Sequence, residues 1–107
     1  MHEKSVALVT GANKGIGKAV VRELAMRGYT VYLASRDASL GVAARASLGL
    51  TDADIRCIQL DVTDADSIAR AARKIEHEVG RVDVLVNNAG ISVNRDPPSL
   101  ISQTLAL

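Results

Sequence analysis

The first apolar run of the sequence, Val6 to Val9, is unbroken and is followed at once by a glycine-rich turn. A continuous apolar strand is typical of a parallel sheet that is covered by helices on both faces. From Gly15 to Arg27 the apolar residues instead recur every four positions, which indicates a helix that ends near Gly28. The chain therefore begins with a strand, a turn and a helix, and the strand is expected near the centre of a sheet.

The same alternation of strand and helix patterns repeats along the chain. The further expected strands are Thr30 to Ala34, Ile55 to Leu60 and Val82 to Val86, and the second expected helix runs from Asp37 or Ser39 to Leu48, before Gly49. The third strand tolerates polar residues, which is typical of a strand near a sheet edge. Strands that alternate with helices imply right-handed crossovers and parallel pairing. The expected fold class is α/β, a Rossmann-type doubly wound parallel sheet that is truncated after about four strand–helix units.

The third helix has two signals of its own. Thr63 to Asp66 has the spacing of a capping box, and Gly80 marks the end of the pattern. One stripe of apolar residues is expected to be buried: Ile68, Ala72, Ile75 and Val79. Beyond Gly90 the segment Asn94 to Pro98 breaks regular structure, and Ser99 to Leu107 is expected to begin another helix.

The length and charge of the chain restrict its function. At 107 residues it is expected to be a single partial domain over residues 1–107. The formal net charge is +1 and the basic residues are scattered, which argues against a nucleic-acid partner. No apolar run is long enough to span a bilayer, so we expect a soluble, cytoplasmic protein. Cys57 is expected to be a buried structural thiol, and His2 and His77 to be surface residues that bind no metal.

The glycine turn lies between the first strand and the first helix, where open α/β sheets bind their ligands. Gly11 would allow the tight turn, Gly15 would let a pyrophosphate approach the backbone, and Gly17 would let the helix pack closely on the strand. The start of the helix supplies N–H groups that favour an anion. The expected ligand is therefore the phosphate of a dinucleotide.

Two alternatives compete with a dinucleotide site. A P-loop has the pattern Gly-x-x-x-x-Gly-Lys-Ser/Thr, but the residue five positions after Gly11 is Ile16. Ala19 follows Lys18, where that motif needs a hydroxyl for magnesium, so phosphoryl transfer is not favoured. The glycines could also build a tight turn and nothing more, but the order of elements around them favours a ligand site.

Three motifs in order resemble those of the short-chain dehydrogenase/reductase family, and of its carbonyl reductase branch in particular. They are Thr-Gly-x-x-x-Gly-x-Gly at Thr10 to Gly17, Asp61-Val62 after the third strand, and Asn-Asn-Ala-Gly at Asn87 to Gly90. The resemblance runs from about Val6 to Ile91. It implies a nucleotide-binding fold and an oxidoreductase activity.

The resemblance also assigns roles to particular residues. It implies that the pyrophosphate is held by Gly11, Gly15, Ile16 and Gly17. It also implies that Asn13 binds the adenosine ribose region and that Asp61 and Val62 contact adenine. Asn88 would lock the central strands, and Ala89 and Gly90 would pass close to the cofactor ribose. Without the family match, the competing interpretation of Asp61 is a plain cap or turn residue, and that of Asn87 and Asn88 is a polar turn that ends a strand.

The end of the second strand bears on the choice between NADP and NAD. A dinucleotide site recognises a ribose 2′-hydroxyl with an acidic residue and a 2′-phosphate with Arg. Arg36 could clamp the phosphate while Ser35 donates a hydrogen bond, or Asp37 could accept from the hydroxyl. Lys14 adds a second cation, which favours NADP and leaves Asp37 as a helix N-cap. The competing interpretation of Lys14 and Arg36 is solvated surface charge.

The family's catalytic residues, a Ser and a Tyr-x-x-x-Lys pair, cannot be placed in these 107 residues. The two tyrosines, Tyr29 and Tyr32, are followed four positions later by Leu33 and Arg36. The sequence therefore suggests the cofactor-binding half of an NADP(H)-dependent oxidoreductase that reduces carbonyls or oxidises alcohols, with no catalytic residue in the chain. The alternative is a non-catalytic NADP-binding module or a truncated gene product. A reading frame that continues into a Tyr-x-x-x-Lys segment would favour the enzyme.

Overall fold

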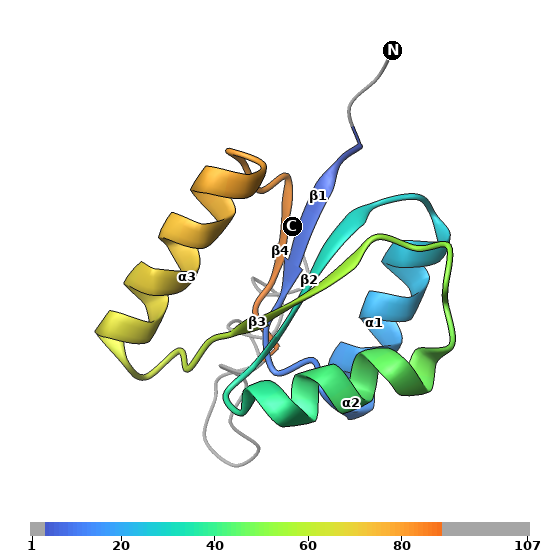
Figure 1. Cartoon of the computed structure of the whole chain (residues 1–107), viewed down its shortest axis with the longest axis horizontal. Coiled ribbons are helices and arrows are strands. Elements are labelled where there is room, and N and C mark those ends of the chain that lie inside the picture. Colours follow the sequence, from blue (N-terminus) through green and yellow to red (C-terminus); the bar gives the residue numbers. More distant parts are fainter. Residues whose placement is uncertain (1–3, 89–107) are drawn as a thin grey trace, which may run out of the picture.

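The computed structural model describes residues 4–88, which form a four-stranded parallel sheet with helices on both faces (Figure 1). The strands are β1 (Val6–Val9), β2 (Thr30–Ser35), β3 (Ile55–Gln59) and β4 (Val84–Val86). The helices are α1 (Gly15–Met26), α2 (Ala38–Leu48) and α3 (Ala65–Glu78). The expected helix at Ser99–Leu107 lies outside the described residues, as does His2.

The strand order β3-β2-β1-β4 confirms the doubly wound fold class. From β1 the chain moves outward through β2 to β3, with α1 and α2 on one face of the sheet. It then returns along the other face through α3 to pair β4 with the far side of β1 (Figure 1). As expected, β1 is an inner strand and β3 an edge strand. The reversal of direction places the switch point of the sheet between β1 and β4.

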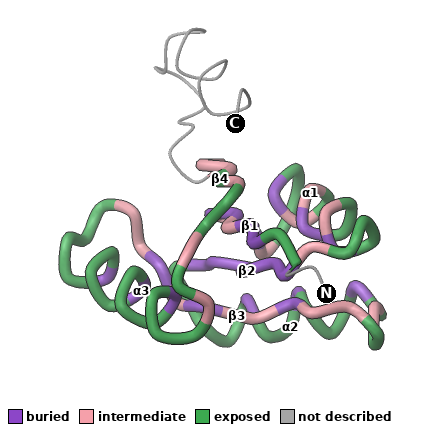
Figure 2. Tube along the Cα trace, turned by 90° about the horizontal axis from the view of Figure 1, so that it is seen from above, coloured by how far each residue is buried: buried purple, intermediate pink, exposed green. Residues whose placement is uncertain are grey.

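The core consists of two apolar layers that share the sheet. Every residue of β2 is buried, as Figure 2 shows. Val31 and Leu33 pack toward α1 and α2, while Tyr32 and Ala34 pack toward α3. This alternation follows from the two-residue period of a strand and explains why the strands have few polar positions.

The helices bury only some of the apolar residues that the sequence pattern favours, and of the stripe expected in α3 only Ile75 is buried. In α3 the buried residues are Ser67, Ala71 and Ile75. The prediction for Ile68 and Ala72 was therefore wrong, since both are exposed. In α1 the buried residues are likewise small, Gly17, Val21 and Ala25. Small side chains let a helix come close to the sheet, and the larger apolar residues then lie on the flanks of the contact.

Several element boundaries differ from those expected. The N-cap of α3 is Asp64, whose side chain accepts from the Asp66 amide, so the capping box beginning at Thr63 was wrong. β2 extends by one residue to Ser35, and β3 ends one residue early, at Gln59. β4 begins at Val84 rather than at Val82 as expected, directly after Asp83, which forms a clamp on β1.

Asp83 fastens the beginning of β4 to β1. Its amide donates to Val6 O at 2.8 Å, and its Oδ2 accepts from Val6 N at 2.7 Å and from Arg81 Nε at 3.1 Å. The hydrogen bond from the Val6 amide, followed by that from Arg81, lowers the pKa of Asp83. A carboxylate with a lowered pKa stabilises the folded state while it is ionised.

A polar network occupies the amino end of the sheet on the α3 side. The Tyr32 hydroxyl donates to Glu78 Oε1 at 2.6 Å, and Arg56 pairs with Asp54 through two nitrogens at 3.0 and 3.1 Å. Burial, followed by Glu78, raises the pKa of Tyr32. This network connects the last turn of α3 to β2 and β3. None of the helices within residues 4–88 is long and apolar enough to cross a membrane.

The clamp at Asp83 makes stability depend on pH. Because the folded pKa is lowered, its contribution is complete above the ordinary Asp pKa of about 3.9 and is lost as the pH falls through the folded value. Wild type should therefore melt at a higher temperature than Asp83→Asn near pH 6, and the gap should close toward pH 3. Thermal melts over this range test it, with Asp52→Asn as a control at an exposed Asp. A gap independent of pH would contradict the clamp.

The outer edge of β4 pairs with no strand of the described region. Leu85 on β4 is 39% exposed, and an exposed apolar edge strand invites association with other chains. We expect the 107-residue chain to sediment above its monomer mass, and Leu85→Lys to shift it toward the monomer. Leu40→Lys, which changes an exposed leucine on α2, should not. A wild-type chain that is monomeric in sedimentation velocity would contradict this expectation.

Candidate nucleotide-binding site

The turn between β1 and α1 depends on two glycines in the left-handed region. Gly11 has φ of 58° and Gly15 has φ of 62°. Residues with a Cβ rarely adopt such angles, so both positions favour glycine. A Cβ added to Gly15 would meet no atom within 4 Å, so the backbone there faces open space.

Gly17 has the packing role expected for it. A Cβ at this position would lie 2.7 Å from Gly11 O, 2.8 Å from Asn88 Nδ2 and 3.0 Å from Ala12 Cα. No side chain fits at these distances without moving the backbone of the turn. Gly17 thus lets the first turn of α1 rest directly on the loop that follows β1.

Asn88 and Thr10 join the end of β4 to the same loop. Asn88 Nδ2 donates to Gly11 O at 3.1 Å, and the Thr10 hydroxyl donates to Asn87 Oδ1 at 3.1 Å. These hydrogen bonds agree with the expected role of Asn88 in locking the central strands. They also end β4 at the switch point of the sheet. Ala89 and Gly90 lie outside the described residues.

The first amides of α1 are open. The first helical hydrogen bond runs from Lys18 N to Lys14 O at 3.4 Å, and the Lys14 side chain does not cap the helix. The N–H groups of Gly15, Ile16 and Gly17 have no acceptor within residues 4–88. Ile16 is 72% exposed, so its side chain is not packed into the turn. Such a helix start attracts an anion.

The end of β2 settles the role of Asp37. Its Oδ1 accepts from Ser39 N at 2.9 Å and from Ser39 Oγ at 2.6 Å, which makes it the N-cap of α2. These bonds from Ser39, the hydroxyl first, lower the pKa of Asp37. Ser35 is buried, and its hydroxyl donates to Asp37 O at 2.7 Å. Both side chains thus hold the turn around Arg36 in shape.

Arg36 and Lys14 are exposed cations at the carboxyl edge of the sheet. Neither forms a salt bridge with another described residue. Arg36 lies close enough to Asp61 to help lower its pKa, although the larger cause is hydrogen bonding from Thr63. The structure therefore brings together a cation that follows β2 and a carboxylate that follows β3.

Asp61 has the turn role that the sequence left open. Its Oδ1 accepts from Thr63 N at 2.9 Å and from Thr63 Oγ1 at 2.6 Å. Its Oδ2 accepts no hydrogen bond within the described region. Val62 beside it is half-buried and packs against the core on the α3 side, and Asn13 is half-buried in the glycine turn.

Two residues that no sequence motif singled out, Gln59 and Ser67, connect these loops. Gln59 Nε2 donates to Arg36 O at 3.1 Å, and Ser67 Oγ accepts from Asp61 N at 2.8 Å. One sequence signal could have identified Ser67, which lies four residues before Ala71 and eight before Ile75 on the same face of the helix. A polar residue in such a buried stripe needs hydrogen-bond partners.

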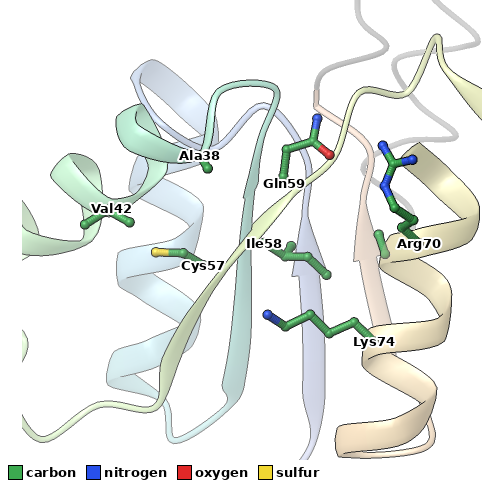
Figure 3. A pocket seen from close by; sticks show the side chains of 8 residues that line it. Ala38, Val42, Cys57, Ile58, Gln59, Arg70 and Lys74 are labelled. Carbon is green, nitrogen blue, oxygen red and sulfur yellow. The ribbon is translucent and has the colours of Figure 1, made fainter. Parts of the chain in front are cut away.

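A cavity of about 360 Å³ lies beside β3, between α2 and α3, and away from the glycine turn (Figure 3). Cys57 points into it from one side, and Arg70 and Lys74 from the other. Cys57 is half-buried rather than buried as expected, and its Sγ donates to Gly41 O at 3.5 Å. Burial raises the pKa of this thiol, which makes it a weak nucleophile at neutral pH.

The family model described as short chain dehydrogenase matches residues 5–105. The chain belongs to this family. The resemblance to this family, seen in the three motifs, is thereby confirmed.

Curated relatives in the short-chain dehydrogenase family match most of this chain. (−)-Isopiperitenone reductase of Mentha piperita is 49% identical over 90 residues, which cover 80% of this chain and 29% of that protein. Carbonyl reductase (NADPH) 1 of Sus scrofa is 45% identical over 95 residues, 88% of this chain and 33% of that protein. The chain therefore spans about a third of the length of these relatives.

The solved structure of menthone neomenthol reductase from Mentha piperita has the same fold. It superposes with a TM-score of 0.79 at 44% identity over 84% of this chain and 33% of that one.

The contact at Gly17 predicts the effect of one methyl group. Gly17→Ala should destabilise the fold by about 1–3 kcal/mol, because the Cβ overlaps backbone that cannot move freely. Chemical denaturation measures this change. Ala19→Ser, at an exposed position in the same turn of α1, is the control and should have little effect. A Gly17→Ala protein as stable as wild type would show that the helix does not need this close approach.

Proposed function

We propose that this chain binds NADP(H) and forms the cofactor-binding part of an oxidoreductase that reduces carbonyls or oxidises alcohols. The observation that carries the proposal is the open first turn of α1, where the N–H groups of Gly15, Ile16 and Gly17 meet no acceptor among the described residues. A diphosphate carries the charge and the oxygen acceptors that such a helix start favours.

The residues around this turn fit a dinucleotide. The open space at Gly15 would admit a phosphate to the backbone, and Gly11 and Gly17 shape the loop beneath it. Asn88 holds Gly11 O and thereby helps to keep the loop in this form. Ala89 and Gly90, which follow Asn88, are proposed to pass close to the cofactor ribose.

The charges at the end of β2 support NADP over NAD. Arg36 and Lys14 are exposed cations without an ion-pair partner in the described region, and they suit a 2′-phosphate. Asp37, the candidate partner for a 2′-hydroxyl, is used as the N-cap of α2. The name of the porcine carbonyl reductase specifies NADPH, in agreement with this choice.

The adenosine end is assigned to the loop after β3. Asp61 Oδ2 has no partner in the described region and could accept from the adenine amino group, with Val62 beside it as an apolar contact. Asn13, in the glycine turn, is assigned to the adenosine ribose. The direct hydrogen bond from Ser35 to a phosphate stays a prediction, because its hydroxyl donates to Asp37 O here.

The bound nicotinamide would supply or accept the hydride, and the residues of this chain would bind and orient the dinucleotide. Tyr32 has no part in proton transfer, because its hydroxyl is held by Glu78 at the amino end of the sheet. The substrate class, a small carbonyl or alcohol, is inferred from the family and from the reductase names of the relatives.

The cofactor assignment predicts that two neighbouring substitutions differ in their effect on the preference for NADPH over NADH. Wild type should bind NADPH more tightly than NADH, and Arg36→Ala should remove most of this preference because the 2′-phosphate loses its cation. Asp37→Ser keeps a good N-cap and removes the carboxylate, so it should leave both affinities nearly unchanged. Nucleotide fluorescence titration measures both dissociation constants for each protein.

Arg73→Ala, which removes an exposed cation on α3, serves as the matched control for charge. Equal affinity of wild type for NADPH and NADH would contradict the assignment of Lys14 and Arg36. A large loss of NADH affinity in Asp37→Ser would instead favour a 2′-hydroxyl site at Asp37.

A further inference from the structure

Ser67 is a fully buried polar residue in the stripe of α3 that packs on the sheet. Its exposure is 0%, and its neighbours in the stripe are Ala71 and Ile75. A buried hydroxyl is unfavourable unless its hydrogen-bonding capacity is used, and alanine would suit this packing equally well. The hydroxyl therefore needs an explanation in the bonds that it makes.

Two hydrogen bonds pass through this hydroxyl, and a third continues from Gln59 to Arg36. The Asp61 amide donates to Ser67 Oγ at 2.8 Å, and Ser67 Oγ donates to Gln59 Oε1 at 3.0 Å. Gln59 Nε2 then donates to Arg36 O at 3.1 Å. Since a backbone carbonyl can only accept, the amide group of Gln59 must present its nitrogen to Arg36, which leaves its oxygen for Ser67. We call these three bonds the Gln59–Ser67 relay.

The relay begins where the pairing of β2 and β3 ends. The Leu60 amide donates to Ser35 O at 2.8 Å, and the two chains then separate into the loops that carry Arg36 and Asp61. Figure 3 shows Gln59 near the end of β3, with its amide group beyond the paired strands. The relay thus ties together two loops that the sheet no longer holds.

We propose that Gln59 and Ser67 are positioning residues that hold the backbone of Arg36 at a set distance from Asp61, and that this spacing gives the site its preference for NADPH over NADH. The inference rests on the proposed function, since it assumes that Arg36 meets a 2′-phosphate and that Asp61 lies at the adenine.

The opposite charges of Arg36 and Asp61 explain why their spacing must be held. A guanidinium and a carboxylate at the ends of adjacent strands attract each other, and a direct pair would neutralise the cation that a 2′-phosphate requires. Arg36 and Asp61 influence each other electrostatically but form no salt bridge in this structure. Thr63 holds the Asp61 carboxylate, and the relay holds the backbone of both residues.

The test compares Ser67→Ala and Gln59→Leu with wild type by titration with NADPH and with NADH. Each variant interrupts the relay, so NADPH affinity should fall about 3- to 10-fold, while NADH affinity changes less than about 2-fold. Thr30→Val is the matched control, because it removes another buried hydroxyl whose bond, to Asp54 Oδ2 at 3.0 Å, lies at the opposite end of β2. Its affinity ratio should equal that of wild type.

Hydrogen exchange of the protein without nucleotide provides a second measurement. The Asp61 amide should exchange faster in Ser67→Ala than in wild type, and no faster in Thr30→Val, because Ser67 Oγ is its acceptor. Gln59→Glu retains an acceptor for Ser67 but presents a carboxylate to Arg36 O. It should therefore keep the slow exchange of Asp61 and still lose the preference for NADPH.

The possible results separate this inference from the proposed function. Wild type that binds neither dinucleotide would overturn both. Wild type that prefers NADPH, together with folded Ser67→Ala and Gln59→Leu variants that keep the full preference, would overturn the inference alone. A reduced ratio in Thr30→Val would also overturn it, because a general loss of stability would then explain the effect.

Discussion

The close approach of α1 to the loop after β1 is the constraint on which the rest of the structure depends. Gly17 leaves no room for a Cβ between the helix and the atoms Gly11 O and Asn88 Nδ2. This contact holds the first turn of α1, whose amides are open, against the loop at the carboxyl end of β1. It also involves Asn88 at the end of β4, so that one packing contact serves both the fold and the candidate binding site.

The two ends of the sheet differ in whether their charged side chains are paired. At the amino end, charged groups are paired, as in the contacts of Arg56 with Asp54 and of Tyr32 with Glu78. At the carboxyl end, Arg36 and Lys14 lack ion-pair partners within residues 4–88. Polar groups there bond both to loop backbone and to neighbouring side chains, as Asp37 does with Ser39 and Asp61 with Thr63. Satisfied networks stabilise the scaffold, whereas unpaired cations remain available to a charged ligand.

The sequence predicted the helices, strands and turns better than it predicted which side chains are buried or hydrogen-bonded between them. Continuous apolar runs identified the strands, and the glycines identified the turn, because these features depend on local backbone geometry. The buried face of α3 was misjudged by one position. Hydrophobicity favoured Ile68, while close packing on the sheet selected Ser67 and Ala71. Gln59 was missed because an isolated glutamine in a strand has no local signal, and its partners lie 8 and 23 positions away.

The sequence by itself determined the strand and helix order, the left-handed turn and the family motifs, since each rests on residue type and spacing. It offered two roles for Asp37 and two for Asp61, and only the tertiary structure shows which hydrogen bonds each carboxylate makes within the chain. Asp37 caps α2 and Asp61 closes a turn with Thr63. The spacing of Arg36 from Asp61 also belongs to the tertiary structure, because it depends on hydrogen bonds between β3, α3 and the loop after β2. Such bonds join residues whose proximity no local pattern encodes.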